Sequence, residues 1–586
     1  MKDKKISYYH KCKYLLGKDA KRVVWCCTFG IISMLFALAN SIFAAYYGIN
    51  KALMSGEFDK IVFATIVIGT LGMLSTLTFH VTYRLCLRIV KSVAIELRQR
   101  VFKKTIYLDT EYYNTHASGA MLNTIIYDVS TFADGMTWSF QWICKLIVKI
   151  LLSFTLVTII NFKLSLILWV IAPVVVVLSI FIFKKVGKQY DHRRTIVRKR
   201  LGFINEGIMG VKTVKSLNLE EDEDRTFRKY NREYGWANFK ISIMNDSFWR
   251  MFDVFVYAGL ALLFLNSYKL SISYGELFLY YQLFKDALYS VGHLAGEFDY
   301  FTEVAVSAGK IYNMLTYDPL IKDKEVTLDK NDTLIGDIKF NNVTFKYPKG
   351  ETVLKDFNFE IKPKQRVAIV GKTGSGKSTI ASLLYRFYEP TEGSVTIDGI
   401  DYTDLKIQYI HEQIGFILQE PMLFDDTIYE NLKYAKDTAT DEEIYNAAKM
   451  VGAHEFISSL KDGYQTRIGE SGILLSNGQK QLLAFARVIL KDPSIVILDE
   501  ATANIDSQTE HLIQKNIDEA FSGKTCLFIA HRLSTIQNCD KIVYLEKGKI
   551  LEEGSHDELM ELNGKYATLY KNQFIRRQLN ELIEEA

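Results

Sequence analysis

A glycine-rich stretch with one lysine and a following serine carries the clearest chemistry in this sequence. "VAIVGKTGSGKSTIASLLY" begins with the apolar run Val367–Val370, turns through Gly371–Lys377 and continues from Ser378 with a helical pattern. The glycines let the loop curl so that its N–H groups point at phosphate oxygens, and the helix N-terminus adds partial positive charge. Lys377 is expected to pair with the β- and γ-phosphates of a nucleotide, and Ser378 to bind Mg²⁺. The predicted phosphate-binding residues are Gly371, Thr373, Gly374, Ser375, Gly376, Lys377, Ser378 and Thr379.

Two adjacent carboxylates end a second apolar run, "SIVILDEATANID". Ile495–Leu498 predicts a buried strand, and Asp499 and Glu500 follow it directly. Ligands sit at the carboxyl ends of the strands in a parallel sheet. Asp499 is therefore expected to hold Mg²⁺, and Glu500 to act as the general base that polarises the attacking water. Together the two motifs predict an ATP-hydrolysing site with ATP and Mg²⁺ as cofactors.

Further motifs stand in a fixed order around these two. They read "FKYPKG", "FILQEP", "TRIGESG", "LLSNGQKQLLAFARVIL" and "FIAHRLST". In this order they resemble the motifs of an ABC exporter half-transporter, in which one membrane domain is fused to one nucleotide-binding domain. The resemblance covers essentially the whole chain, because "YYNTHASGAMLNTIIYDV" and "EGIMGVKTVKSLNLEE" resemble the two coupling regions of the membrane domain.

The resemblance assigns roles to single residues. It implies that Tyr347 stacks on adenine, that Gln419 senses Mg²⁺ and the γ-phosphate, and that His531 contacts the γ-phosphate. The signature residues implied to contact ATP bound to a partner chain are Ser476, Asn477, Gly478 and Gln479. The predicted catalytic residues are Glu500, His531 and Gln419, and the predicted magnesium ligands are Ser378, Gln419 and Asp499.

The signature departs from the family pattern at Asn477, where glycine is usual. Asparagine is among the non-glycine residues that best tolerate a left-handed backbone, so we expect a mild effect. In a homodimer, both sites would carry Asn477. In a heterodimer, this chain would supply Glu500 and His531 to one competent site, and its altered signature would complete the other. We favour a heterodimer with a second half-transporter, because "TANID" also departs from the usual D-loop; the homodimer stays open.

Long apolar runs occupy the first part of the chain, and each is close to the length of about 20 residues that a membrane span needs. The predicted spans are about 23–49, 61–83, 138–160, 164–183, 248–266 and 277–297. The sequence therefore predicts an all-α six-helix transmembrane domain with long cytoplasmic helix extensions, followed by an α/β P-loop nucleotide-binding domain. The predicted boundaries are 1–320 for the membrane domain, 321–335 for a linker and 336–586 for the nucleotide-binding domain.

Basic residues predict the orientation of this domain in a cell membrane. Lys and Arg crowd the segment before the first span and the long segments 84–137 and 184–247, which places them and the nucleotide-binding domain in the cytoplasm. The two long segments are helical in pattern and are expected to reverse at Gly119 and Gly210. The formal charge of +4 is nearly balanced for 586 residues and implies no nucleic-acid partner. The seven cysteines lack CxxC spacing and are interpreted as reduced packing residues.

Charged residues inside the spans are the best sequence clue to a substrate, because they are costly in lipid. They are Lys145, Lys149, Asp253, Lys285 and Asp286. One interpretation is a cavity for an anionic or zwitterionic substrate, and the other is structural pairing of Lys with Asp between spans. The sequence does not choose between a peptide, a lipid and a drug-like amphiphile as the exported substrate. The alternative class is an ATP-gated channel or regulatory subunit without active pumping.

Overall fold

The computed structural model describes residues 7–267, 272–324, 333–348, 350–469, 472–499, 519–529 and 536–572, without the side chains of residues 183, 267, 295, 298 and 299. The chain divides into two compact units. The first comprises Met1–Leu108 and Thr115–Asp318, and the second comprises Asp109–Asn114 and Pro319–Ala586. The predicted domain boundaries and linker stay predictions of the sequence.

The first unit is helical. Its α-helices are α1 (Tyr8–Leu16), α2 (Ala20–Phe43), α3 (Phe58–Ile106), α5 (Ser118–Asn123), α6 (Val129–Asp134), α7 (Phe140–Ile160), α8 (Phe162–Met209), α9 (Val211–Ser216), α10 (Glu220–Ser267) and α11 (Tyr274–Leu315). A 3₁₀ turn, η1 (Gly17–Asp19), and three π-helical segments join them: η2 (Ala44–Leu53), η3 (Thr124–Asp128) and η4 (Gly135–Ser139). The short helix α4 (Thr110–Thr115) lies where the chain passes between the two units.

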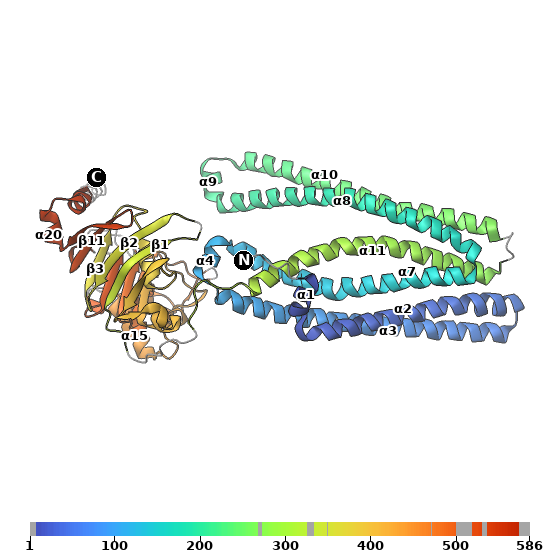
Figure 1. Ribbon diagram of the computed structural model, residues 1–586, viewed down its shortest axis with the longest axis horizontal. Helices are drawn as coiled ribbons and strands as arrows, with labels where there is room; N and C mark the ends of the chain where they lie inside the picture. Colours follow the sequence, from blue (N-terminus) through green and yellow to red (C-terminus); the bar gives the residue numbers. More distant parts are fainter. Residues whose placement is uncertain are drawn as a thin grey trace. The chain divides into compact units, whose positions relative to one another are not determined.

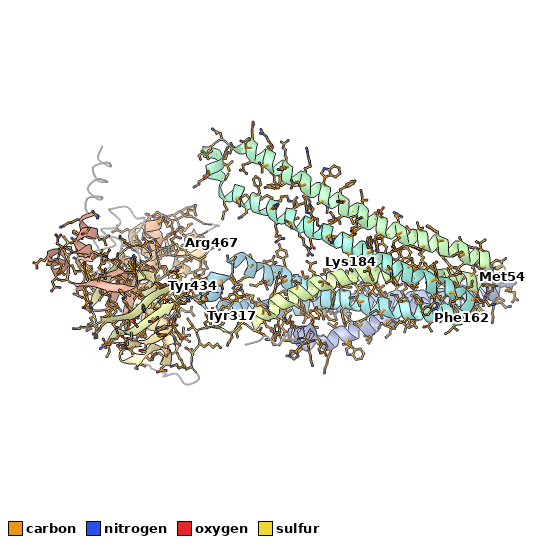
Figure 2. All side chains as sticks on the ribbon, turned by 45° about the horizontal axis from the view of Figure 1, so that its top comes forward. Met54, Phe162, Lys184, Tyr317, Tyr434 and Arg467 are labelled. Atoms are coloured by element: carbon orange, nitrogen blue, oxygen red, sulfur yellow. The ribbon has the colours of Figure 1, made fainter. Side chains whose placement is uncertain are left out.

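The long helices form two groups. Figure 1 shows α2, α3, α7 and α11 running side by side, and α8 and α10 forming a second pair joined by α9. In Figure 2, Met54 and Phe162 lie at the same end of this unit. These residues mark the turns before α3 and after α7, which the sequence assigned to one side of the membrane. The orientation of that side stays a prediction.

Five helical segments of the described chain are long and apolar enough to cross a membrane: Tyr8–Leu53, Phe58–Ile106, Ser118–Ile160, Phe162–Met209 and Glu220–Asn266. The predicted span 277–297 lies in α11, a 42-residue helix that is not among them by composition, so the sixth span stays a prediction. The expected fold class, a helical membrane region followed by an α/β domain, is confirmed.

The two predicted chain reversals have different outcomes. Gly210 ends α8, as predicted. The prediction for Gly119 was wrong, because that residue lies inside α5 and the chain already leaves α3 after Ile106. The Asp109 carboxylate accepts a hydrogen bond from the backbone N–H of Tyr112 at 3.0 Å, and this local capping begins the short helix α4 before the glycine is reached.

The second unit contains two larger sheets and a two-stranded one. The six-stranded sheet has the order β12-β11-β3-β10-β9-β6, the four-stranded sheet β2-β1-β4-β5, and the small sheet β7-β8. The strands are β1 (Ile338–Lys346), β2 (Thr352–Ile361), β3 (Arg366–Val370), β4 (Glu392–Ile397), β5 (Ile400–Asp401), β6 (Ile414–Ile417), β7 (Asp426–Thr427), β8 (Arg467–Ile468), β9 (Ile495–Asp499), β10 (Thr525–Ile529), β11 (Lys541–Glu546) and β12 (Lys549–Gly554).

In the six-stranded sheet the neighbouring pairs are parallel except that β12 is antiparallel to β11. Its central strands are continuous apolar runs, because helices cover both faces of a parallel sheet. The helices of this unit are α12 (Lys377–Leu384), α13 (Ile407–Gln413), α14 (Ile428–Lys433), α15 (Asp441–Met450), α16 (Ala453–Ser459), α17 (Asn477–Lys491) and α20 (His556–Glu561), with 3₁₀ turns η5 (Tyr402–Asp404) and η6 (Gly463–Gln465).

Candidate functional site

One edge of the six-stranded sheet collects the predicted phosphate and magnesium residues. Strand β10 pairs in parallel with both β3 and β9, and Ile529 stands opposite Ile369 on one side and Asp499 on the other. Asp499 therefore lies level with the end of β3, about 10 Å away across two strand spacings. Because parallel strands present their carboxyl ends at one edge, Asp499 and the phosphate loop that begins at Gly371 emerge together.

Gln419 reaches the same edge from the next strand. β6 pairs in parallel with β9, with Ile417 opposite Leu498, and Gln419 follows two residues after Ile417. The structure thus brings together three segments that are far apart in sequence. Their order across the sheet is phosphate loop, Asp499, Gln419.

Different structural requirements explain the individual glycines of the phosphate loop. Gly374 and Gly376 have φ of 81° and 107°, which L-residues rarely adopt. A Cβ on Gly374 would meet nothing within 4 Å, so this glycine is needed for its backbone conformation rather than for space. At Gly371 a Cβ would lie 2.2 Å from the carbonyl oxygen of Leu545, so this glycine allows the loop to pass close to β11.

The loop also holds polar groups that suit a polyphosphate. Lys377 is only 5% exposed, and its Nζ donates to the carbonyl oxygens of Gly371 at 2.8 Å and Lys372 at 3.2 Å. The Ser375 hydroxyl is buried and has no hydrogen-bond partner within the described chain. A buried ammonium beside an unsatisfied hydroxyl fits the charge and hydrogen-bonding needs of ATP phosphates.

The three predicted magnesium ligands are oxygen donors, the type that Mg²⁺ prefers. Ser378 is exposed in the first turn of α12, and Asp499 is half-buried at the end of β9. No cluster of three or more His, Cys, Asp or Glu side chains suited to a metal occurs in the described residues. Magnesium needs no such cage, because it is held by one or two carboxylates together with substrate phosphates.

Two hydrogen bonds and one ring contact connect Tyr347 to Thr379 after the phosphate loop and to the short helix α4. The Tyr347 hydroxyl lies 3.1 Å from the Thr379 hydroxyl, and its ring packs edge-on against Tyr388 at 5.1 Å between centroids. Asn114 Nδ2 donates to the Tyr388 hydroxyl at 2.6 Å. Burial raises the pKa of Tyr388, so the phenol stays protonated and neutral. The sequence interpretation missed both residues: Tyr388 lies in no motif that it used, and Asn114 lies in the first coupling motif without having been singled out.

The signature segment forms the start of α17. Ser476 is its N-cap: the Ser476 hydroxyl accepts from the Gln479 N–H at 3.2 Å, and the Gln479 side chain accepts from the Ser476 N–H at 3.0 Å. Asn477 is the first helical residue and is not among the described non-glycine residues with positive φ. The tolerance of asparagine for a left-handed backbone is therefore not needed here, because an ordinary helical turn begins at Asn477. The mild effect of the substitution stays a prediction.

Two polar residues of α17, the buried Gln481 and the half-buried Arg487, link the signature helix to the segment around Gln419, and the sequence interpretation missed both. Gln481 is 2% exposed, and its Nε2 donates to the carbonyl oxygen of Gln419 at 3.4 Å. Arg487 donates to the carbonyl oxygens of Met422 at 2.8 Å and Asn431 at 2.7 Å. Polar residues on the buried face of an otherwise apolar helix were the signal that could have identified them.

Several predicted residues lie outside the described chain. They are Glu500, His531, the D-loop residues Asn504–Asp506, and Glu470 and Ser471 of "TRIGESG". Their roles stay predictions.

Within the first unit, three of the charged residues predicted to lie in spans are paired. Lys149 Nζ lies 3.0 Å from Asp286 Oδ1. Asp253 accepts from the Tyr289 hydroxyl and from Arg250 Nη1, the latter at 3.2 Å. The structural-pairing interpretation therefore describes Lys149 and Asp286, which lie on different helices. Asp253 instead pairs with an arginine of its own helix.

Comparison with known proteins agrees with this geometry. The family described as ABC transporter transmembrane region matches residues 23–288, and the ABC transporter family matches residues 354–503. The chain is 36% identical over 508 residues to the "ATP-dependent lipid A-core flippase" of Legionella pneumophila (strain Lens), covering 84% of each chain. It is 30% identical to the "Uncharacterized ABC transporter ATP-binding protein YknV" of Bacillus subtilis (strain 168), over 93% of this chain and 91% of the relative.

A third relative has a different described role. The "Mitochondrial potassium channel ATP-binding subunit" of Rattus norvegicus is 31% identical over 503 residues, which cover 83% of this chain and 69% of the relative. Both family matches fall in one chain, and the flippase matches most of its length. The chain therefore belongs to the ABC transporter family, as an ATP-hydrolysing, multi-pass membrane half-transporter with one membrane region fused to one nucleotide-binding domain.

Proposed function

We propose that this protein is half of a dimeric exporter, which uses ATP to move an amphipathic substrate out of the cytoplasm by alternating access. The observation that carries the proposal is the sheet edge at which the phosphate loop, Asp499 and Gln419 emerge, in a chain whose described part also has five helical segments long and apolar enough to cross a membrane. A peptide, a lipid and a drug-like amphiphile are the candidate substrates. The name of the lipid A-core flippase relative favours a lipid among these candidates.

The nucleotide site is proposed to be complete only in the dimer. In each chain, Lys377 and the loop glycines hold the phosphates, and Ser378, Gln419 and Asp499 hold Mg²⁺. Glu500 accepts a proton from the attacking water, and His531 contacts the γ-phosphate. The residues Ser476–Gln479 contact the nucleotide of the opposite chain. ATP binds the closed dimer better than the open one. This difference in affinity shifts the membrane helices toward the conformation that accompanies the closed dimer.

The experiment uses the protein reconstituted in liposomes with a fluorescent lipid and ATP. Active export predicts substrate movement that stops in Glu500→Gln, while the mutant still binds nucleotide and stays in a closed dimer. A control substitution, Glu412→Gln, removes a carboxylate from α13, away from the predicted site, and should leave turnover unchanged. Undiminished ATP turnover in Glu500→Gln would contradict the assigned base.

The potassium-channel relative favours a second candidate, an ATP-regulated channel subunit. The same liposomes separate the two functions. A channel passes ions down a gradient when nucleotide is bound without hydrolysis, so Glu500→Gln would keep its flux. An exporter loses transport in that mutant.

A further inference from the structure

A group of four long helices in the first unit contains a cavity with polar side chains on its wall. The cavity measures about 390 Å³ and is lined by residues of α2, α3, α7 and α11. Hydroxyl and amide side chains lie among apolar ones on its wall: Ser33, Ser41, Ser75, Thr76, Ser153 and Gln282. This volume falls in the range of small-molecule pockets, which in helical bundles lie between the helices.

The charges on this wall do not balance. Its ionisable groups are two ammonium groups, Lys145 and Lys149, and one carboxylate, Asp286. Lys149 and Asp286 form the ion pair at 3.0 Å, with side chains 32% and 28% exposed. Lys145 instead lies over two aromatic rings, at 4.8 Å from the centroid of Trp142 and 5.7 Å from that of Phe79. The cavity therefore carries an excess positive charge at Lys145, which lies over ring faces.

On the predicted spans, the excess charge lies inside the bilayer. Lys149 is about 17 Å from the outer end of the predicted span 138–160, and Lys145, one helical turn further, is about 22 Å from it. A lysine at this depth is costly, and it usually marks a functional site or reaches for the interface. Lys145 lines the cavity and lies over Trp142, so its ammonium is held within the helix group.

We propose that this cavity binds the anionic headgroup, a phosphate or a carboxylate, of an amphiphilic substrate. The inference rests on the proposed export function and names its substrate class. An anion beside Lys145 neutralises the excess charge, and the Gln282 amide on the same wall can donate to it. The hydroxyls of Ser33, Ser41, Ser75 and Thr76 already donate to helix carbonyl oxygens and contribute only polarity. The cavity is the size of a headgroup, so the apolar tail lies along the helix faces.

Lys285 offers a matched control. It lies next to Asp286 in the sequence and at nearly the same predicted membrane depth, but it is exposed and does not line the cavity. Lys285→Gln removes the same charge from the membrane domain without changing the cavity wall. Any general electrostatic effect on an anion should therefore appear equally in Lys145→Gln and Lys285→Gln.

The test measures saturable binding of radiolabelled dodecyl phosphate to the purified dimer in nanodiscs of zwitterionic lipid, without ATP and relative to protein-free nanodiscs. Lys145→Gln should weaken binding about tenfold or more, because charge-assisted hydrogen bonds are lost. Asp286→Asn should strengthen binding several-fold, because it frees Lys149. Lys285→Gln should have little effect. Opposite shifts in the first two variants cannot come from general loss of folding.

Three results would overturn the proposal: equal weakening by Lys145→Gln and Lys285→Gln, weaker binding in Asp286→Asn, or equally good binding of dodecyltrimethylammonium. Inorganic phosphate distinguishes the source of the anion. If inorganic phosphate displaces labelled dodecyl phosphate as effectively as unlabelled dodecyl phosphate does, the site binds a free anion, and the proposal of an amphiphilic substrate is overturned. Binding without ATP-driven movement would refute the export function alone, whereas ATP-driven export of another amphiphile without dodecyl phosphate binding would refute this inference alone.

Discussion

At the scale of single residues, Asn477 is explained by helix geometry. It occupies the first position of α17, where any L-residue can adopt the helical backbone, and Ser476 supplies the cap. Glycine is therefore not required at this position by conformation. What glycine would change is the surface, since it removes an amide side chain from the segment predicted to meet the partner's ATP.

Asn477→Gly should raise ATP turnover in a homodimer, where both sites carry the asparagine, and change it little in a heterodimer. The measurement is steady-state phosphate release from the purified dimer. A clear fall in turnover would contradict both versions of this account.

Two substitutions of Ser476 distinguish its role in stability from its predicted role in ATP turnover. Ser476→Ala removes the N-cap and should cost about 1 kcal/mol of stability, read as a lower melting temperature of the nucleotide-binding unit. Ser476→Asp keeps the cap and the stability, but places a negative charge where the partner's phosphates are predicted to lie. We therefore expect turnover to fall in Ser476→Asp without a loss of melting temperature. Normal turnover in that variant would remove Ser476 from the proposed site.

At the scale of elements, the contact of α4 with Tyr388 connects the first chain reversal to the nucleotide site. Asn114, Tyr388, Tyr347 and Thr379 contact one another in series. Because Tyr347 is predicted to stack on adenine, nucleotide binding and the position of α4 are expected to influence each other.

Tyr388→Phe removes the hydroxyl that Asn114 bonds but keeps the ring. It should leave ATP affinity close to that of the wild type, cost about 1 kcal/mol of stability and weaken the stimulation of turnover by substrate. Tyr385→Phe is the control, because it removes a hydroxyl from the same segment, on a ring that stacks on His411 instead. If both variants keep full stimulation, the contact has no part in coupling.

Local pattern predicted some of these elements well and others not at all. The strand before the phosphate loop and the strand that ends at Asp499 were predictable, because an apolar run bounded by a glycine turn or by carboxylates is a local signal. The bond from Asn114 to Tyr388 joins residues 274 apart in sequence, so no local period could reveal it. The break before α4 was misplaced at Gly119, because glycine was weighed above the capping carboxylate of Asp109.

At the scale of the whole molecule, the proposed site is completed by a second chain. The residues Ser476–Gln479 are predicted to contact ATP held by another phosphate loop. If the protein works as a heterodimer, the chain purified alone should hydrolyse ATP slowly. The rate of hydrolysis should rise when a second half-transporter with a regular signature is added. Phosphate release measured against the proportion of partner tests this. A rate that is already maximal with this chain alone would support the homodimer.

The boundary between the two compact units has a practical meaning. Residues 109–114 belong to the nucleotide-binding unit, although they are encoded more than two hundred positions before the rest of it. A fragment beginning at Pro319 would consequently lack one helix of this unit, and the Tyr388 hydroxyl would lose its bond to Asn114. Anyone who excises this ATPase for crystallisation or drug screening should graft those six residues back, or accept a protein whose surface beside Tyr347 differs from that of the intact transporter.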